Sequence, residues 1–260
     1  MIIRKRNLLY KLVVPGPTPE PTVELPPSNQ IWYEATSQLT SLNIGTPIEH
    51  TFNSSTGRGV LTYASDIADS RTIASNAFRE QSSLTKIWWP ASCMSWDNDC
   101  MHTCPELQEI YAGSSLQAVS DGTCNNGTTP RKIVLVDNDY FYKNETGLVQ
   151  KSNNTLYLGT YNLDIRDTSC VTLGSRCMAD MELNGATLYF PSTMRGYQGD
   201  YNIGNGNNTD VYTIYLPCFH VPSWNTDYIR GQKITWYIPV NNVGYEVWSS
   251  IDRFDIIPIL

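Results

Sequence analysis

A short apolar pattern recurs seven times along this chain of 260 residues and constrains its fold more than any other feature. Each copy begins with a polar residue and continues with mostly apolar ones, and six of the seven copies end in Pro or Gly. The copies occupy residues 86–90, 109–113, 132–136, 155–159, 187–191, 213–217 and 235–239. The first three intervals are 23 residues each, and such a period is typical of a solenoid whose units stack on one another. The pattern predicts a mainly β solenoid of about seven turns with short helical turns.

Alternation within the copies predicts which side chains face the core. Successive residues of a strand point to opposite sides of a sheet, so the first residue of each copy is expected to face water. The second and fourth residues are expected to form the core: Ile87, Trp89, Ile110, Ala112, Ile133, Leu135, Leu156, Leu158, Leu188, Phe190, Ile214, Leu216, Trp236 and Ile238.

The third residues share the water-facing side and are aromatic in six copies; the copy at 132–136 has Val134 instead. Parallel strands lie about 4.8 Å apart, so a continuous exposed aromatic ladder is expected, wider than the apolar patch that a monomer usually exposes. Two alternatives to a binding role stay open: the rings only stack to stabilise the sheet, or they are buried against another chain. We interpret the ladder as a partner-binding face formed by Trp88, Tyr111, Tyr157, Tyr189, Tyr215 and Tyr237.

The charge distribution separates a short basic segment from an acidic body. The formal net charge is −7, yet residues 1–14 contain no acid and four basic side chains: Arg4, Lys5, Arg6 and Lys11. The acidic body argues against nucleic-acid binding, whereas residues 1–14 are expected to act as an anchor peptide for an acidic partner. Residues 15–30 contain six prolines and predict a semi-rigid linker; the alternative is a disordered tail of no consequence.

The remaining sequence divides into two caps and the repeats. Residues 31–72 alternate like a β-structured N-terminal cap, residues 73–240 hold the repeats, and residues 241–260 are expected to form a C-terminal cap. No apolar stretch approaches the roughly 20 residues of a membrane-spanning helix. Residues 1–14 superficially resemble a signal peptide, but Lys11 interrupts their apolar stretch, so we expect the peptide to stay on the mature protein.

The seven cysteines include no Cys-x-x-Cys pair. We therefore expect buried free thiols in a chain that is made in a reducing environment. Cys100, His102 and Cys104 are the closest approach to a metal cluster.

Catalytic patterns are not recognisable in the sequence. The histidines, His50, His102 and His220, have no partner motif. Acidic residues in turn-like sequence are expected to lie in solvated loops rather than in calcium sites: Asp137, Asp139, Asp200 and Asp210. We predict that the protein is not an enzyme and that it uses no metal or other cofactor.

The segment 73–90, IASNAFREQSSLTKIWWP, resembles the BspA-type leucine-rich repeats of Bacteroidales surface proteins. Those repeats have an Ile-Gly-x-x-Ala-Phe turn followed by a Ser-Leu-x-x-Ile-x-Ile-Pro strand. Residues 100–110 match in the same register, and the regions 30–63 and 243–257 are similar to the caps of such proteins. The resemblance implies a leucine-rich-repeat-type solenoid with a role in adhesion, although the family usually has a small polar residue where this chain has its aromatic ladder.

The first thirty residues resemble the start of structural proteins in tailed phages of Bacteroidales hosts, including crAss-like phages. This resemblance implies a head fibre or capsid decoration protein, anchored by residues 1–14 to the capsid or another virion protein and assembled in the host cytoplasm. We expect a homo-oligomer that displays its repeats toward a host surface protein or glycan. The alternative is a leucine-rich repeat adhesin on the bacterial cell surface.

Overall fold

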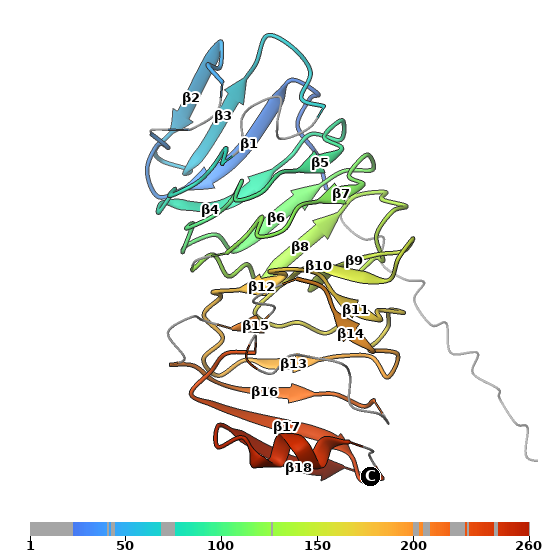
Figure 1. Ribbon diagram of the computed structural model, residues 1–260. Coiled ribbons are helices and arrows are strands. Elements are labelled where there is room, and N and C mark those ends of the chain that lie inside the picture. The colour runs from blue at the N-terminus through green and yellow to red at the C-terminus, as the bar shows by residue number, and fades with distance from the viewer. Residues whose placement is uncertain are drawn as a thin grey trace, which may run out of the picture.

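The chain forms a mainly β solenoid of about seven turns, as predicted, and six of the seven recurring strands stack in parallel along one side of it. Figure 1 shows the computed structural model from its N-terminal cap to its C-terminal end. One six-stranded sheet contains β4 (Leu84–Trp88), β6 (Glu109–Ala112) and β8 (Lys132–Leu135). A four-stranded parallel sheet continues the same side with β13 (Thr187–Tyr189), β16 (Val211–Tyr215), β17 (Lys233–Pro239) and β18 (Phe254–Ile259).

The structure describes residues 23–40, 42, 45–68, 76–125, 127–199, 203–204, 209–218, 227, 229–241 and 244–259. The predicted anchor peptide, with Arg4, Lys5, Arg6 and Lys11, lies outside these residues, and so does the first part of the Pro-rich linker.

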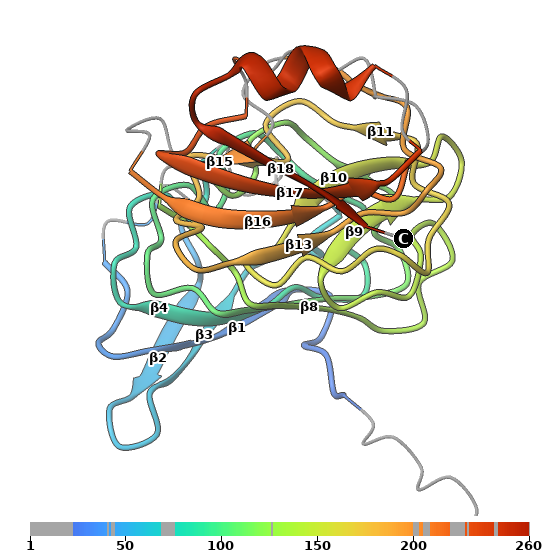
Figure 2. The same ribbon diagram turned by 90° about the horizontal axis from the view of Figure 1, so that it is seen from below.

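Shorter strands form the other sides of the coils. One side carries β5 (Ser95–Trp96) paired with β7 (Ala118–Val119), and a sheet of β9 (Gly147–Gln150), β10 (Thr155–Gly159), β11 (Thr172–Leu173) and β14 (Gly196–Tyr197). The other side carries β12 (Met178–Ala179) paired with β15 (Ile203–Gly204). Viewed along the stack, β9, β10 and β11 lie across the core from β15 (Figure 2).

The corners of the coils repeat with the same period as the strands. Backbone φ is positive at Asn76, Asp99 and Gly122, and again at Arg176 and Gly199, each 23 residues after the one before within its group. This left-handed conformation turns the chain sharply and is most easily adopted by Gly, Asn and Asp. Four of the five corner positions hold one of these residues.

Both ends of the solenoid are covered. The N-terminal cap is an antiparallel sheet of β1 (Gln30–Ala35), β2 (Glu49–Asn53) and β3 (Arg58–Thr62), and β1 pairs with the first repeat strand, β4. At the other end, the 3₁₀ helix η3 (Tyr245–Ser250) covers the last coil. Its Trp248 contacts the rings of Trp236 and Phe254.

The core follows the predicted alternation closely. Thirteen of the fourteen predicted core residues are buried, and the remaining one, Leu135, is half-buried against the core. All seven cysteines are buried free thiols, as expected. Burial raises the pKa of Cys104 and Cys170 to about 12 and that of Cys218 to about 11.

The fourth copy departs from the predicted arrangement. Residues 155–159 form β10, which pairs antiparallel with β9 and belongs to another sheet. The position expected for Tyr157 is occupied by Asp164, which pairs with Tyr189 of β13. The turn 151–154, in which Asn154 has φ 54°, causes this departure. It folds β9 and β10 into a hairpin, so a later segment of the chain lies beside β13. Tyr157 is therefore not part of the ladder.

Candidate functional site

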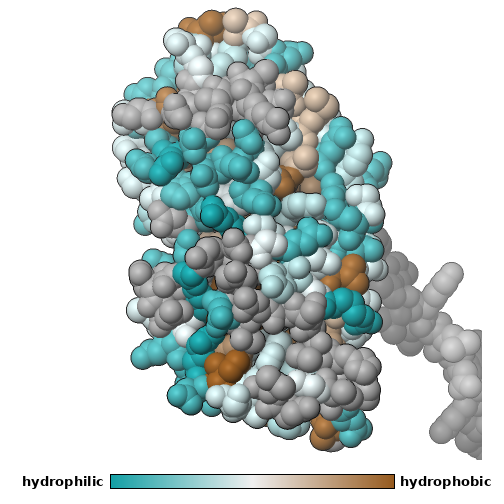
Figure 3. Space-filling model, in the orientation of Figure 1, coloured by the Kyte–Doolittle hydropathy of each residue, from teal (hydrophilic) through white to brown (hydrophobic). Residues whose placement is uncertain are grey.

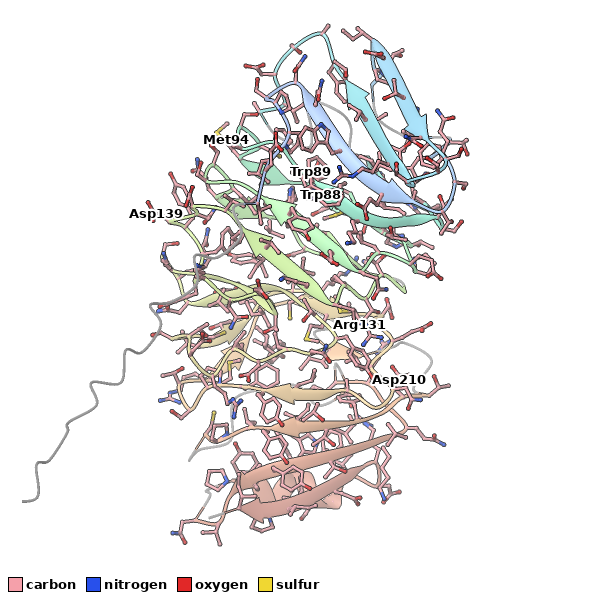
Figure 4. The ribbon with its side chains drawn as sticks, turned by 180° about the vertical axis from the view of Figure 1, so that it is seen from behind. Trp88, Trp89, Met94, Arg131, Asp139 and Asp210 are labelled. Atoms are coloured by element: carbon pink, nitrogen blue, oxygen red, sulfur yellow. The ribbon has the colours of Figure 1, made fainter. Side chains whose placement is uncertain are left out.

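The candidate site is the outer face of the six-stranded sheet. The pairing of its strands places six residues in one line, which we call the outer row: Thr51, Val60, Trp32, Trp88, Tyr111 and Val134. The row joins the N-terminal cap to the first three repeats, so the predicted ladder continues into the cap through Trp32. Trp88 lies where the cap strands meet the first repeat (Figure 4).

Trp88 is less exposed than predicted. Its relative exposure is 9%, because its strand lies between those of Trp32 and Tyr111. The ring of Trp88 stacks on that of Tyr111 with centroids 4.7 Å apart and planes 9° from parallel. The other ladder residues in the two sheets are half-buried, so the wide exposed ladder is replaced by a partly buried one.

A row of alternating charges runs beside the outer row. In register order it consists of Arg58, Glu34, Lys86, Glu109 and Lys132. Glu34 lies 3.5 Å from the Arg58 Nε and 3.6 Å from the Lys86 Nζ, and Lys86 Nζ lies 3.2 Å from Glu109 Oε1. These opposite charges largely neutralise one another along the sheet.

The charged row is also hydrogen-bonded to the outer row. The Tyr111 hydroxyl donates to Glu109 Oε2. Burial acts to raise the pKa of Glu109, but the Tyr111 hydrogen bond and the Lys86 ammonium outweigh it and hold this pKa below its usual value. Burial and the Glu109 carboxylate raise the pKa of Tyr111.

The second part of the ladder is a stack of three rings, which we call the tyrosine stack: Tyr189, Tyr215 and Tyr237. The centroids of Tyr189 and Tyr215 lie 4.7 Å apart, and those of Tyr215 and Tyr237 lie 4.4 Å apart, with planes within 16° of parallel. Arg166 covers the Tyr189 end, with its guanidinium carbon 4.3 Å from the ring centroid. Ile257 lies opposite Tyr237 at the other end.

The tyrosine stack uses its ring faces within the protein. Tyr215 has one neighbour on each face, and Tyr189 has Tyr215 on one face and Arg166 near the other. Arg166 is itself held by Asp164, at an Nη2–Oδ2 distance of 2.5 Å. Stacked rings in this arrangement present edges and hydroxyl groups to water, and their contacts stabilise the sheet. Compared with the aromatic residues of the outer row, the tyrosine stack therefore has the properties expected of a structural element.

The cap sheet contains a depression of about 370 Å³ on its outer face. Its lining includes Trp32 and Trp88 of the outer row together with polar side chains of β1, β2 and β3: Gln30, Glu49, Thr51, Arg58 and Thr62. We call it the cap depression. The indole N–H of Trp32 donates to Gln30 Oε1 at 2.9 Å, so the two side chains fix each other.

The opposite side of the molecule has a different character. In Figure 3 most of the coloured surface is hydrophilic or near neutral, and hydrophobic colour occurs as separate spots. The exposed large hydrophobic residues of the described regions are likewise spread over separate parts of the chain: Ile48, Met94, Tyr140, Val211, Val240 and Ile257. The outer row is therefore the better candidate for recognition.

The candidate metal and catalytic residues do not come together in the described part of the chain. His50 Nε2 lies 2.7 Å from the Tyr33 hydroxyl, and His102 Nδ1 lies 2.6 Å from Thr103 Oγ1. Burial lowers the pKa of both histidines. No group of three or more His, Cys, Asp or Glu side chains that could hold a metal ion occurs among the described residues; His220 lies outside them.

Comparison with known proteins gives no relative. No family model, curated protein or solved structure matches the chain. Within the described regions, no helix has the length and apolar character needed to cross a membrane.

Proposed function

We propose that this protein is a non-enzymatic structural protein of a phage virion, a head fibre or capsid decoration. In this role residues 1–14 bind the capsid or another virion protein, and the solenoid is displayed outward in several copies to bind a surface partner. The stacked coils suit this task because each adds length and binding surface without needing a separate core. Several copies on one particle would add avidity to weak individual contacts.

The observation that supports this proposal best is the firm attachment of the linker to the solenoid. Pro26 is buried, and the Leu25 side chain reaches the backbone at Gly113. Ser28 accepts a hydrogen bond from the Ile67 backbone at 2.7 Å and donates through its hydroxyl to Asp66 at 2.6 Å. A tether that leaves the body at one fixed place can hold the solenoid in a defined orientation.

This finding also shortens the predicted linker. Residues 23–29 lie along the cap and the first coils, held by contacts such as that from Asn29 Nδ2 to the Tyr63 carbonyl at 3.1 Å. Residues 15–22 remain as the segment that would separate the anchor peptide from the solenoid. At about 3.1 Å per residue in a polyproline II conformation, they would span about 25 Å.

The proposal is tested by mass spectrometry of purified particles and by removal of the tether. Deletion of residues 1–22 keeps the contacts of Leu25 and Ser28, so the melting temperature should stay unchanged while the chain is lost from particles. A matched variant replaces Arg4, Lys5, Arg6 and Lys11 with Ser. Absence of the wild-type chain from particles, or retention of the shortened chain, would overturn the proposal. Recovery on the bacterial cell surface would instead support the adhesin alternative.

A further inference from the structure

The cap depression offers aromatic surface together with side chains that are already oriented. Trp32 is half-buried and fixed by its hydrogen bond to Gln30, and Trp88 is fixed by its stacking on Tyr111. Side chains that are fixed before binding lose little conformational freedom when a ligand arrives. In the tyrosine stack, by contrast, both faces of the central ring, Tyr215, are covered by the neighbouring rings.

The charges around the depression favour a neutral ligand. Its lining contains one acid, Glu49, and one base, Arg58. Arg58 is already paired with Glu34 of the charged row. An anionic ligand would meet Glu49, and a cationic ligand would meet Arg58, so neither sign of charge is favoured.

The polar groups suit a ligand that carries many hydroxyl groups. Thr51 and Thr62 provide hydroxyls that both donate and accept, Glu49 provides acceptors, and the Nε2 of Gln30 is the donating end of an amide whose Oε1 is engaged by Trp32. A flat aromatic surface bordered by such groups matches a sugar ring, which has apolar C–H faces and a rim of hydroxyls. The volume of about 370 Å³ lies in the lower part of the range for small-molecule sites.

We propose that the cap depression binds a neutral saccharide, with the Trp32 ring against the apolar face of a sugar, the largely buried Trp88 at its border, and Gln30, Glu49, Thr51 and Thr62 at its hydroxyls. A peptide that joined the cap sheet as a further strand would pair at the free edge of β2 and not over this face, because both edges of β1 and of β3 are already paired. The inference gives a ligand class to the surface partner proposed above, but it rests on the geometry of the cap alone.

The test uses the full chain on an array of neutral gluco-, manno-, galacto- and xylo-oligosaccharides, with sulfated and sialylated oligosaccharides as the anionic arm. The strongest neutral ligand is then measured by calorimetry. Trp32→Ala should weaken binding about tenfold or more, as loss of an aromatic contact of roughly 1.4 kcal/mol predicts. Thr51→Arg is a second variant: Thr51 is exposed on the edge strand β2, so the larger side chain should block the depression and leave the fold intact. Tyr215→Ser should bind like wild type.

Three results would overturn the proposal: binding to no neutral oligosaccharide, binding only to the anionic ones, or unchanged binding by a folded Thr51→Arg variant. These results are separate from the particle experiment. A chain that is absent from particles but binds neutral saccharides contradicts only the virion proposal, and a particle protein that binds none contradicts only this one.

Discussion

The indole ring of Trp88 stacks on the phenol ring of Tyr111 across the first two repeat strands, with centroids 4.7 Å apart and planes 9° from parallel. The same geometry recurs in the tyrosine stack, where Tyr215 lies 4.7 Å from Tyr189 and 4.4 Å from Tyr237. The surroundings of the two groups differ. Arg166 and Ile257 lie at the two ends of the tyrosine stack, whereas Trp88 borders the cap depression.

The tyrosine stack should contribute to stability. Tyr215→Ser removes two ring contacts, each of which contributes roughly 1 kcal/mol to stability. In a protein of this size, the loss of both is expected to lower the melting temperature by about 5 °C. Tyr215→Phe keeps the ring and serves as the matched control, with little change expected. Thermal unfolding followed by circular dichroism gives the comparison. Equal melting temperatures for the Ser and Phe variants would show that the ring contacts do not stabilise the sheet.

Position 59 in the N-terminal cap should tolerate only Gly, because the ring of Tyr33 fills the space next to it. A Cβ atom at Gly59 would lie 1.9 Å from Tyr33 Cζ, and that ring is buried and bonded to His50. Gly59→Ala should therefore lower the unfolding free energy by about 1–3 kcal/mol. In a Tyr33→Ala background the same change should cost much less, because the overlap is gone. Denaturant unfolding of the four proteins measures the coupling, and additive effects would exclude it.

The charged row should make stability depend on acid pH. The pKa of Glu109 in the folded protein lies below its ordinary value of 4.5. The contribution of its carboxylate to the unfolding free energy is therefore complete above pH 4.5 and is lost as the pH falls through the folded pKa. Wild type should exceed Glu109→Gln in unfolding free energy at pH 7, by about 1 kcal/mol or less for a partly exposed group. The difference should shrink in acid. A difference that is constant from pH 7 to pH 3 would contradict this account.

The cysteines should be unreactive while the protein is folded. All seven are buried, and the pKa values of Cys104 and Cys170 are raised to about 12. Because the thiolate is the reactive form, a thiol reagent at pH 8 should label none of them in the native protein and all seven in denaturant. Mass spectrometry counts the added groups. Rapid labelling of native Cys104 or Cys170 would show that the coils open locally.

The core could be predicted from the sequence because alternation is a local property. In each repeat strand the second and fourth residues must share a side, whichever neighbours the strand acquires. For this reason pairs such as Leu188 and Phe190, or Trp236 and Ile238, are buried as expected. Even Leu156 and Leu158 are buried, although their strand lies on another side of the solenoid.

The position of Tyr157 could not be predicted from the period alone. Its copy keeps the interval of 23 residues, but strand pairing depends on the whole connection. The sequence does contain one signal against a place for Tyr157 in the ladder. The segment 151–154, Lys-Ser-Asn-Asn, lies between two short apolar runs, which is typical of a hairpin turn. Asp164, which lies beside Tyr189 where Tyr157 was expected, belongs to no copy of the pattern.

Trp32 was the main omission from the predicted site. The alternation of residues 30–33 already placed Ile31 and Tyr33 on one side and Trp32 on the other. No residue pattern indicates that β1 pairs with β4 and so brings Trp32 opposite Trp88. That contact joins segments more than fifty residues apart in antiparallel orientation, and the repeat pattern carries no information about it.

We expect the aromatic residues of the outer row to act in binding and the tyrosine stack to act in stability. The decisive experiment measures both the melting temperature and the binding of one neutral oligosaccharide for Trp32→Ala and Tyr215→Ser, prepared side by side. Folded Trp32→Ala should lose binding, while Tyr215→Ser should melt at a lower temperature and bind like wild type below its transition. Loss of binding by folded Tyr215→Ser together with full binding by Trp32→Ala would contradict this expectation.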